Sequence, residues 1–142
     1  MLDLKTYIVN VLMADSVLQT YLKDQNGNMN IFPQDVDLQP EQFPCIIFMD
    51  SGLSVMSRPQ GMHVGGFQLD ILSTLDDLQV EQIYTRVAQL LNFKDSTTQT
   101  IPNNGILWWM REQNTRDFHE TGRRLWRKAI VLKIWISNAD QS

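Results

Sequence analysis

The strongest constraint on the fold is a helix-like stripe that lies between two stretches patterned like β-strands. Apolar residues recur every three or four positions across 77–91, which is the spacing of one helix face. These residues are Val80, Ile83, Tyr84, Val87, Ala88 and Leu91. Segments 67–71 and 124–136 alternate instead with a period of two, which is typical of strands with one buried face. The chain is therefore predicted to pack an amphipathic helix on one face of a sheet.

The first 22 residues predict two consecutive helices. Leu4, Ile8, Val11 and Leu12 share a face at helical spacing. The pair Asp15-Ser16 then interrupts the pattern, and either side chain can cap a second short helix that ends near residue 22.

Further strands are expected before and after the central helix. Segment 30–33 is a short extended piece, and 45–49 is an apolar run typical of a central strand buried on both faces. Segments 34–44 and 94–105 are expected to be loops.

The closing third predicts an antiparallel hairpin. Its strands are expected at 106–111 and 124–136, joined by a long polar turn over 114–122. In the second strand the expected core side chains are Trp126, Ile130, Leu132, Ile134 and Ile136. Arg127, Lys133 and Trp135 are expected on the opposite face, so Trp135 and the similarly placed Trp109 are candidates for helix packing or for contact with a partner.

The resulting fold class is α+β, with a mostly antiparallel sheet, N-terminal helices and one central amphipathic helix packed on one face. A chain of 142 residues is the size of one domain. Segment 51–66, which holds four glycines and Pro59, is expected to form a protruding arm or loop, and 137–142 a flexible polar tail.

Charge and cysteine usage exclude some classes of function. Residues 1–110 carry five Lys/Arg against twelve Asp/Glu, whereas residues 111–142 carry seven against four. An acidic chain is a poor candidate for bulk nucleic-acid binding, but segregated charge suits packing against a copy of itself or a charged partner. The single cysteine, Cys45, is expected to be a buried apolar residue, as in a cytosolic protein. No signal peptide and no apolar run long enough to cross a membrane is apparent.

The sequence offers no motif for catalysis, a cofactor or a metal. Its two histidines, His63 and His119, lack metal-ligand spacing, and both are expected to be solvated, His119 within the polar turn. The pair Asp76-Asp77 is explained by capping of the helix that follows. Phosphate-binding loops and nucleophile elbows are also missing.

The basic and aromatic residues after position 107 leave three interpretations open. They are a buried core edged by solvated cations, a protein interface, or a surface on which nucleic acid stacks. The residues concerned are Trp108, Trp109, Arg111, Arg116, Arg123, Arg124, Trp126, Arg127 and Lys128.

The order of these elements resembles the tail-terminator, or tail-completion, family of long-tailed phages. The resemblance rests on an N-terminal helix of the pattern Leu4-x3-Ile8-x2-Val11-Leu12, on the segment 30–33, and on the strand 43–48. It continues through the alternating strand 67–71 and the helix 77–91. It covers residues 1–93 well and residues 106–136 loosely.

This resemblance implies a virion protein that forms a six-fold ring at the head-proximal end of the tail tube. The implied partners are other copies of the chain, the tail tube protein and the neck or head-closure protein, with DNA passing through the ring but no sequence-specific nucleic acid bound. Neither an enzyme activity nor a catalytic residue is implied, and assembly takes place in the host cytoplasm. The candidate contacts to the tube or a neighbour are Met56, Arg58 and Met62, and those to the ring or neck are Trp109, Arg123, Arg124 and Arg127.

Three rival interpretations remain. The nearest rival stays within virion assembly and is a head-closure or neck protein, or a tube subunit, although a tube subunit would usually need more β-strand than this sequence offers. Outside it, the basic C-terminal hairpin suits a nucleic-acid-binding module, which would show steeply salt-dependent binding. An enzyme comes last.

Overall fold

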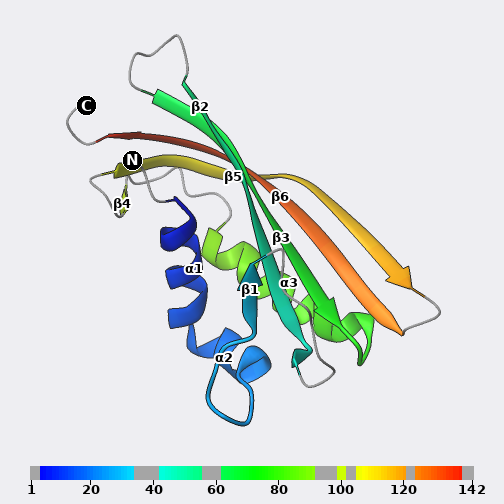
Figure 1. Cartoon of the computed structure of the whole chain (residues 1–142). Helices are drawn as coiled ribbons and strands as arrows, with labels where there is room; N and C mark the ends of the chain where they lie inside the picture. The colour runs from blue at the N-terminus through cyan, green and yellow to red at the C-terminus, as the bar shows by residue number, and fades with distance from the viewer. Residues whose placement is uncertain are drawn as a thin grey trace.

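The computed structural model describes residues 4–33, 42–55, 62–91, 99–101, 105–120 and 124–138. Within them the chain forms three helices and one six-stranded sheet, so the predicted α+β class is confirmed (Figure 1). The helices are α1 (Leu4–Ala14), α2 (Ser16–Leu22) and α3 (Asp77–Leu91). The strands are β1 (Ile31–Pro33), β2 (Cys45–Val55), β3 (Met62–Ser73), β4 (Gln99–Ile101), β5 (Gly105–Glu120) and β6 (Leu125–Asn138).

The sheet is mostly antiparallel, as predicted. Its order is β1-β2-β3-β6-β5-β4, and the pairing of β1 with β2 is the parallel one. The long strands β3 and β6 pair from Met62↔Ser137 to Ser73↔Trp126, which makes them the centre of the sheet. The prediction of a loop over 94–105 is wrong in part, because strand β4 lies inside that segment and extends the edge beyond β5.

All three helices contribute to one apolar core. The stripe of α3, with Val80, Ile83, Val87 and Leu91 buried, faces side chains of β3 and β6. Those strand residues are Phe67, Leu69 and Ile71 together with Ile130, Leu132, Ile134 and Ile136, each at most 2% exposed. Because successive strand residues point to opposite faces, the intervening side chains lie on the face away from α3. We call that side of β3, β5 and β6 the outer face.

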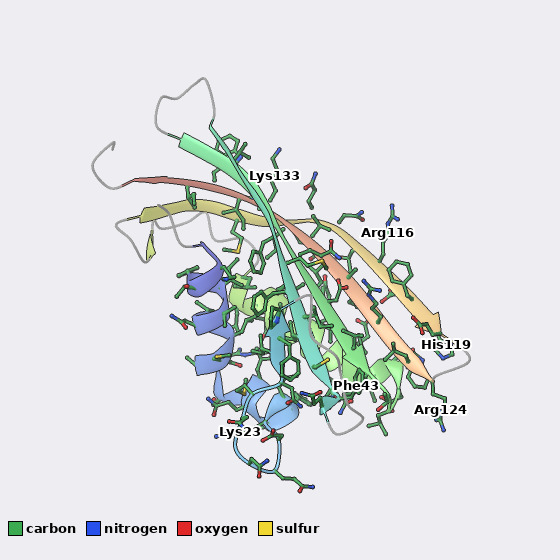
Figure 2. The ribbon with its side chains drawn as sticks, in the orientation of Figure 1. Lys23, Phe43, Arg116, His119, Arg124 and Lys133 are labelled. Atoms are coloured by element: carbon green, nitrogen blue, oxygen red, sulfur yellow. The ribbon has the colours of Figure 1, made fainter. Side chains whose placement is uncertain are left out.

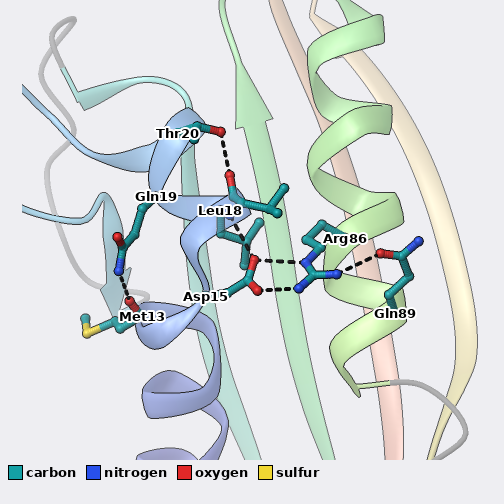
Figure 3. Close-up of polar contacts among 8 residues, drawn as sticks. Met13, Asp15, Leu18, Gln19, Thr20, Arg86 and Gln89 are labelled. Carbon is teal, nitrogen blue, oxygen red and sulfur yellow. Dashed lines mark hydrogen bonds and ion pairs between the residues drawn. The ribbon is translucent and has the colours of Figure 1, made fainter.

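The two N-terminal helices meet at the predicted break, where Asp15 also contacts α3 (Figure 3). Asp15 caps α2 by accepting a hydrogen bond from the amide of Leu18 at 2.9 Å. Arg86 of α3 donates to the same carboxylate from Nε at 2.9 Å and from Nη2 at 2.5 Å. The hydrogen bond from Arg86 is the main cause that lowers the pKa of Asp15. Asp15 therefore holds three helices together.

Strand β5 is much longer than the sequence predicted. The expected polar turn over 114–122 is wrong for residues 114–120, which remain paired with β6 as far as Glu120↔Leu125. Two register shifts, at Leu107/Trp109 and Glu112/Asn114, explain the error. Beyond the second shift the side chains that face α3 change from even to odd positions, so no single alternation runs through the strand.

Strand β2 lies second from one edge of the sheet, not at its centre as predicted. At its start both faces are nevertheless covered, because Ile46 belongs to the main core and Cys45 to a small cluster on the opposite side. This small cluster consists of Cys45, Leu72 and Leu125, packed against Phe32, Phe43 and Ile47. Cys45 is fully buried as predicted, and this burial raises the pKa of its thiol to about 12.

The predicted arm over 51–66 falls partly inside the sheet. Residues 51–55 continue β2, and residues 62–66 begin β3, with pairs from Leu53↔Gly65 to Val55↔His63. The same part of β3 also pairs with β6 on its other side. Residues 56–61 lie outside the described part of the chain, as do 139–142 of the predicted tail.

Candidate protein-interaction surface

An ion pair between Asp70 and Arg127 lies in the middle of the outer face. Asp70 of β3 is only 3% exposed although no described helix covers this face. Arg127 of β6 donates from Nη2 to Asp70 Oδ2 in a very short contact, and Gln68 donates from Nε2 to Asp70 Oδ1 at 2.9 Å. The carboxylate is thus enclosed by polar partners from two strands. A buried charge requires such partners, because an unpaired one costs several kcal/mol, on the order of 3–5.

Strand register explains how these residues meet. Arg127 pairs across the sheet with Leu72 of β3, which places its guanidinium diagonally beside Asp70. On its other side Arg127 pairs with Phe118 of β5 and lies over that ring, 5.6 Å from the centroid. Phe118 is 47% exposed. Three adjacent strands therefore contribute to one ordered patch of carboxylate, guanidinium and ring.

The rest of the outer face is basic, with a few apolar residues. Arg116 and Lys133 are exposed and point away from the helices (Figure 2). Neither side chain has an ion-pair partner within the described residues. Trp135 is half-buried between the core residues Ile134 and Ile136, as expected for the face opposite the core, and its backbone pairs in register with that of Trp109. Exposed Arg and aromatic side chains on a rigid sheet are typical of the centres of protein interfaces.

The opposite side of the same hairpin carries acidic groups around one buried lysine. Lys128 is not a solvated cation, which was one of the three interpretations for this set of residues, because it is 6% exposed and faces α3. Its Nζ lies 2.6 Å from Glu81 Oε1, 3.0 Å from Asp117 Oδ1 and 4.5 Å from the Tyr84 ring centroid. Burial alone would lower the pKa of Lys128, but the hydrogen bonds to the two carboxylates outweigh it and raise this pKa.

These acidic groups line a hollow of about 340 Å³ between the start of α3 and the end of the β5–β6 hairpin. Its lining residues are Asp77, Val80, Glu81, Asp117, Phe118, His119, Trp126 and Arg127. Three carboxylates lie there with the ammonium of Lys128 and with the guanidinium of Arg124 beside Trp126, whereas the guanidinium of Arg127 pairs with Asp70. The hollow is therefore net negative.

His119 also belongs to this hollow. Its predicted place in a polar turn is wrong, because it lies in β5 and stacks on Trp126 with ring centroids 4.7 Å apart. The side chain is exposed, as predicted. Arg124 follows the hairpin turn with a positive φ of 49°, and its guanidinium lies 5.9 Å from the Trp126 centroid.

The predicted contact residues that the structure describes lie at two ends of the long strands. Met62 begins β3, paired with Ser137, and Trp109 lies near the same end of the long strands. Arg124 and Arg127 lie at the other end, where the hairpin β5–β6 turns. Met56, Arg58 and Arg123 lie outside the described residues.

Two residues central to this surface, Asp70 and Phe118, are not among the predicted contacts. Asp70 is a polar residue within the alternating segment 67–71, and that pattern does not predict an ion pair. Phe118 is the single apolar residue of the predicted turn over 114–122, so no apolar alternation marks a strand there.

Metal ligation and membrane crossing find no support in the described part of the chain. No group of three or more His, Cys, Asp or Glu side chains there could hold a metal ion. None of the described helices is long and apolar enough to cross a membrane.

The fold resembles that of a known virion component. A chain from a structure described as the virion of a native gene transfer agent particle superposes with a TM-score of 0.75, over 95% of this chain and 95% of that chain. The two sequences are 14% identical, so the likeness shows a shared fold. No protein-family model matches the sequence, and no curated protein matches it.

Proposed function

We propose that this chain is a structural protein of a phage-like virion, and that it acts as a tail terminator. The observation that carries the proposal is the fold shared with a gene transfer agent virion chain along nearly the full length of both. The order of helices and strands that resembles the tail-terminator family supports the finer assignment. In this role the chain forms a six-fold ring on the head-proximal end of the tail tube, stops tube growth and joins the tail to the neck.

The surfaces of the subunit suit such a role. A ring of identical subunits needs two different, complementary surfaces on each copy, because each subunit contacts the next one head to tail. The outer face is basic, and the hollow beside α3 is acidic. Both are built on long paired strands, which hold their side chains in place without help from a partner.

The proposed partners are further copies of the chain, the tail tube protein and the neck or head-closure protein. Arg124, Arg127 and Trp109 are proposed to make ring or neck contacts. Met56, Arg58 and Met62, at the connection between β2 and β3, are proposed to contact the tube or a neighbour. The role needs no catalysis and no cofactor.

The proposal is tested by disrupting the gene in the phage that carries it and imaging the lysate by negative-stain electron microscopy. Overlong tails beside filled, tailless heads are expected, because tube growth would no longer be stopped. Complementation with the wild-type gene on a plasmid should restore normal particles and serves as the control.

Other outcomes would change the assignment. Tails of normal length that fail to join heads would move the chain to the neck, as a head-closure protein. Infectious particles of normal form would contradict an assembly role. The nucleic-acid alternative would then be examined through the salt dependence of DNA binding by the purified chain.

A further inference from the structure

We infer that the outer face of one copy packs against the acidic hollow of a second copy, with Arg116 and Lys133 facing the carboxylates of Asp77, Glu81 and Asp117. The inference rests on the proposed function in one respect, that copies of the chain assemble with each other. It goes further by naming the two surfaces that meet.

Charge complementarity is the main argument. On the outer face, Arg116 and Lys133 are exposed cations with no ion-pair partner among the described residues. In the hollow, Asp77 is exposed and likewise has no partner there. Each surface thus holds charge that its own chain leaves unbalanced, and the two surfaces are opposite in sign.

The carboxylates beside Lys128 add to the negative charge. Glu81 and Asp117 share the single ammonium of Lys128, and their side chains are 49% and 70% exposed. Two carboxylates with one cation retain a net negative charge that a second cation can balance. Because both side chains reach solvent, a partner can approach them without opening the core.

The shape and chemistry of the hollow fit an arginine or lysine side chain. Its volume of about 340 Å³ is ample for one long side chain. The half-buried Trp126, stacked on His119, supplies an aromatic surface for a guanidinium or ammonium group. Arg124 of the same chain also lies near this ring, 5.9 Å from its centroid.

The outer face also offers a rigid centre for such a contact. Arg127 is held between Asp70 and the ring of Phe118, so little conformational entropy remains for it to lose on binding. Phe118, exposed at 47%, provides the apolar area that charge pairs alone lack. The two surfaces differ, although both reach Phe118 and Arg127 at the end of the hairpin. A contact between them is therefore heterologous and adds copies head to tail, as a ring requires.

The test uses a charge swap in the full chain. The first variant, Arg116→Glu/Lys133→Glu, reverses the outer face, and the second, Asp77→Lys/Asp117→Lys, reverses the hollow. Self-association of each is measured by sedimentation velocity over a range of concentrations, and folding is checked by thermal melting. The matched control is Lys5→Glu/Lys23→Glu, which reverses two exposed cations of the N-terminal region.

Each reversed variant alone is expected to self-associate at least about tenfold more weakly than the wild type. Mixing the two reversed variants should restore association, because each then offers the surface that the other lost. The control should associate like the wild type. Should Asp77→Lys/Asp117→Lys melt early, the single variant Asp77→Lys takes its place.

Three results would overturn the inference. They are unchanged association of the outer-face variant, failure of the mixture to recover, and a wild-type chain that stays monomeric at every concentration. None of these depends on tail morphology, so the gene-disruption experiment can support the proposed function while this contact fails. Normal particles after disruption would instead contradict the function and leave the measured contact between copies standing.

Discussion

The two faces of the sheet differ in what they bury. Towards α3, strands β3 and β6 present side chains such as Phe67, Leu69 and Ile134, all fully buried in an apolar core. Towards the outer face the same strands present Asp70 and Arg127, a charged pair held in place by hydrogen bonds and a ring. The same two strands therefore present apolar core residues on one face and a fixed ion pair on the other.

This difference separates folding from recognition. Burying an aliphatic or aromatic side chain stabilises a domain by about 1.5–3 kcal/mol, so the α3 side accounts for the fold. A buried ion pair contributes little net stability, because desolvation offsets its Coulomb energy. The Asp70–Arg127 pair is therefore better suited to defining a docking surface than to stabilising the fold. Substitutions should therefore lower the free energy of unfolding most in the core, less at the buried ion pair and the helix cap, and least at the exposed cations.

Phe67→Ala should lower the free energy of unfolding by about 3–5 kcal/mol, because it leaves a cavity in the core. Phe67 is fully buried and stacks with Phe48 at a centroid distance of 6.2 Å. The change is measured by urea denaturation. Leu78→Ala is the control, since Leu78 is 60% exposed, and should cost under about 0.5 kcal/mol. Similar losses for the two variants would contradict the assignment of the core.

Arg127→Met should cost about 2–3 kcal/mol, less than a fully buried pair because the Arg127 side chain is 39% exposed. The loss arises because Asp70 is left charged and enclosed. Lys133→Met, on the same strand and face but exposed, is the control and should be nearly neutral. In the double variant Asp70→Asn/Arg127→Met part of the loss should return, and additive losses would argue against a coupled pair.

Asp15→Ala should cost about 1 kcal/mol through loss of the helix cap. The pKa of Asp15 is lowered in the fold, mainly by the hydrogen bond from Arg86, so its contribution is present above about pH 4 and is lost as pH falls through the lowered folded-state pKa. Wild type should therefore lose its advantage over Asp15→Ala in acid, as followed by urea denaturation at several pH values. The variant Arg86→Met keeps the cap and separates its effect from the ion pair. A difference between wild type and Asp15→Ala that does not depend on pH would refute this role.

Arg116→Glu/Lys133→Glu should leave the free energy of unfolding within about 0.5 kcal/mol of wild type, since both side chains are exposed. Its effect should appear in self-association. A large loss of stability would mean that these cations support the fold, and the contrast between the two faces would weaken.

The helices and strands were largely predictable from the sequence because their apolar spacing is regular. The stripe of α3, the break at Asp15 and the alternation around Phe67 each depend on neighbours within a few residues. The extent of β5 was not predictable in this way, because two register shifts change which residues face the core. Strand β4 was missed because three residues hold too little pattern to detect.

The candidate surface was predictable only in part, for a similar reason. Arg127 stood out as a cation on the face opposite the core, and the structure places it there. Its partner Asp70 lies 57 positions earlier, on β3, and its partner Phe118 lies on β5. Only the register of the paired strands brings these three residues together. The burial of Lys128 could not be predicted from neighbouring residues, because its ion-pair partner Glu81 lies on α3, far away in sequence.

The central claim is that the outer face is an assembly interface of a virion. The most direct measurement is a cryo-electron microscopy reconstruction of the particle that carries this chain. The account predicts a ring of copies at the head-proximal end of the tail, with Arg116, Phe118, Arg127 and Lys133 of each copy covered by its neighbour. A ring in which this face is open to solvent, or particles without the chain, would contradict it.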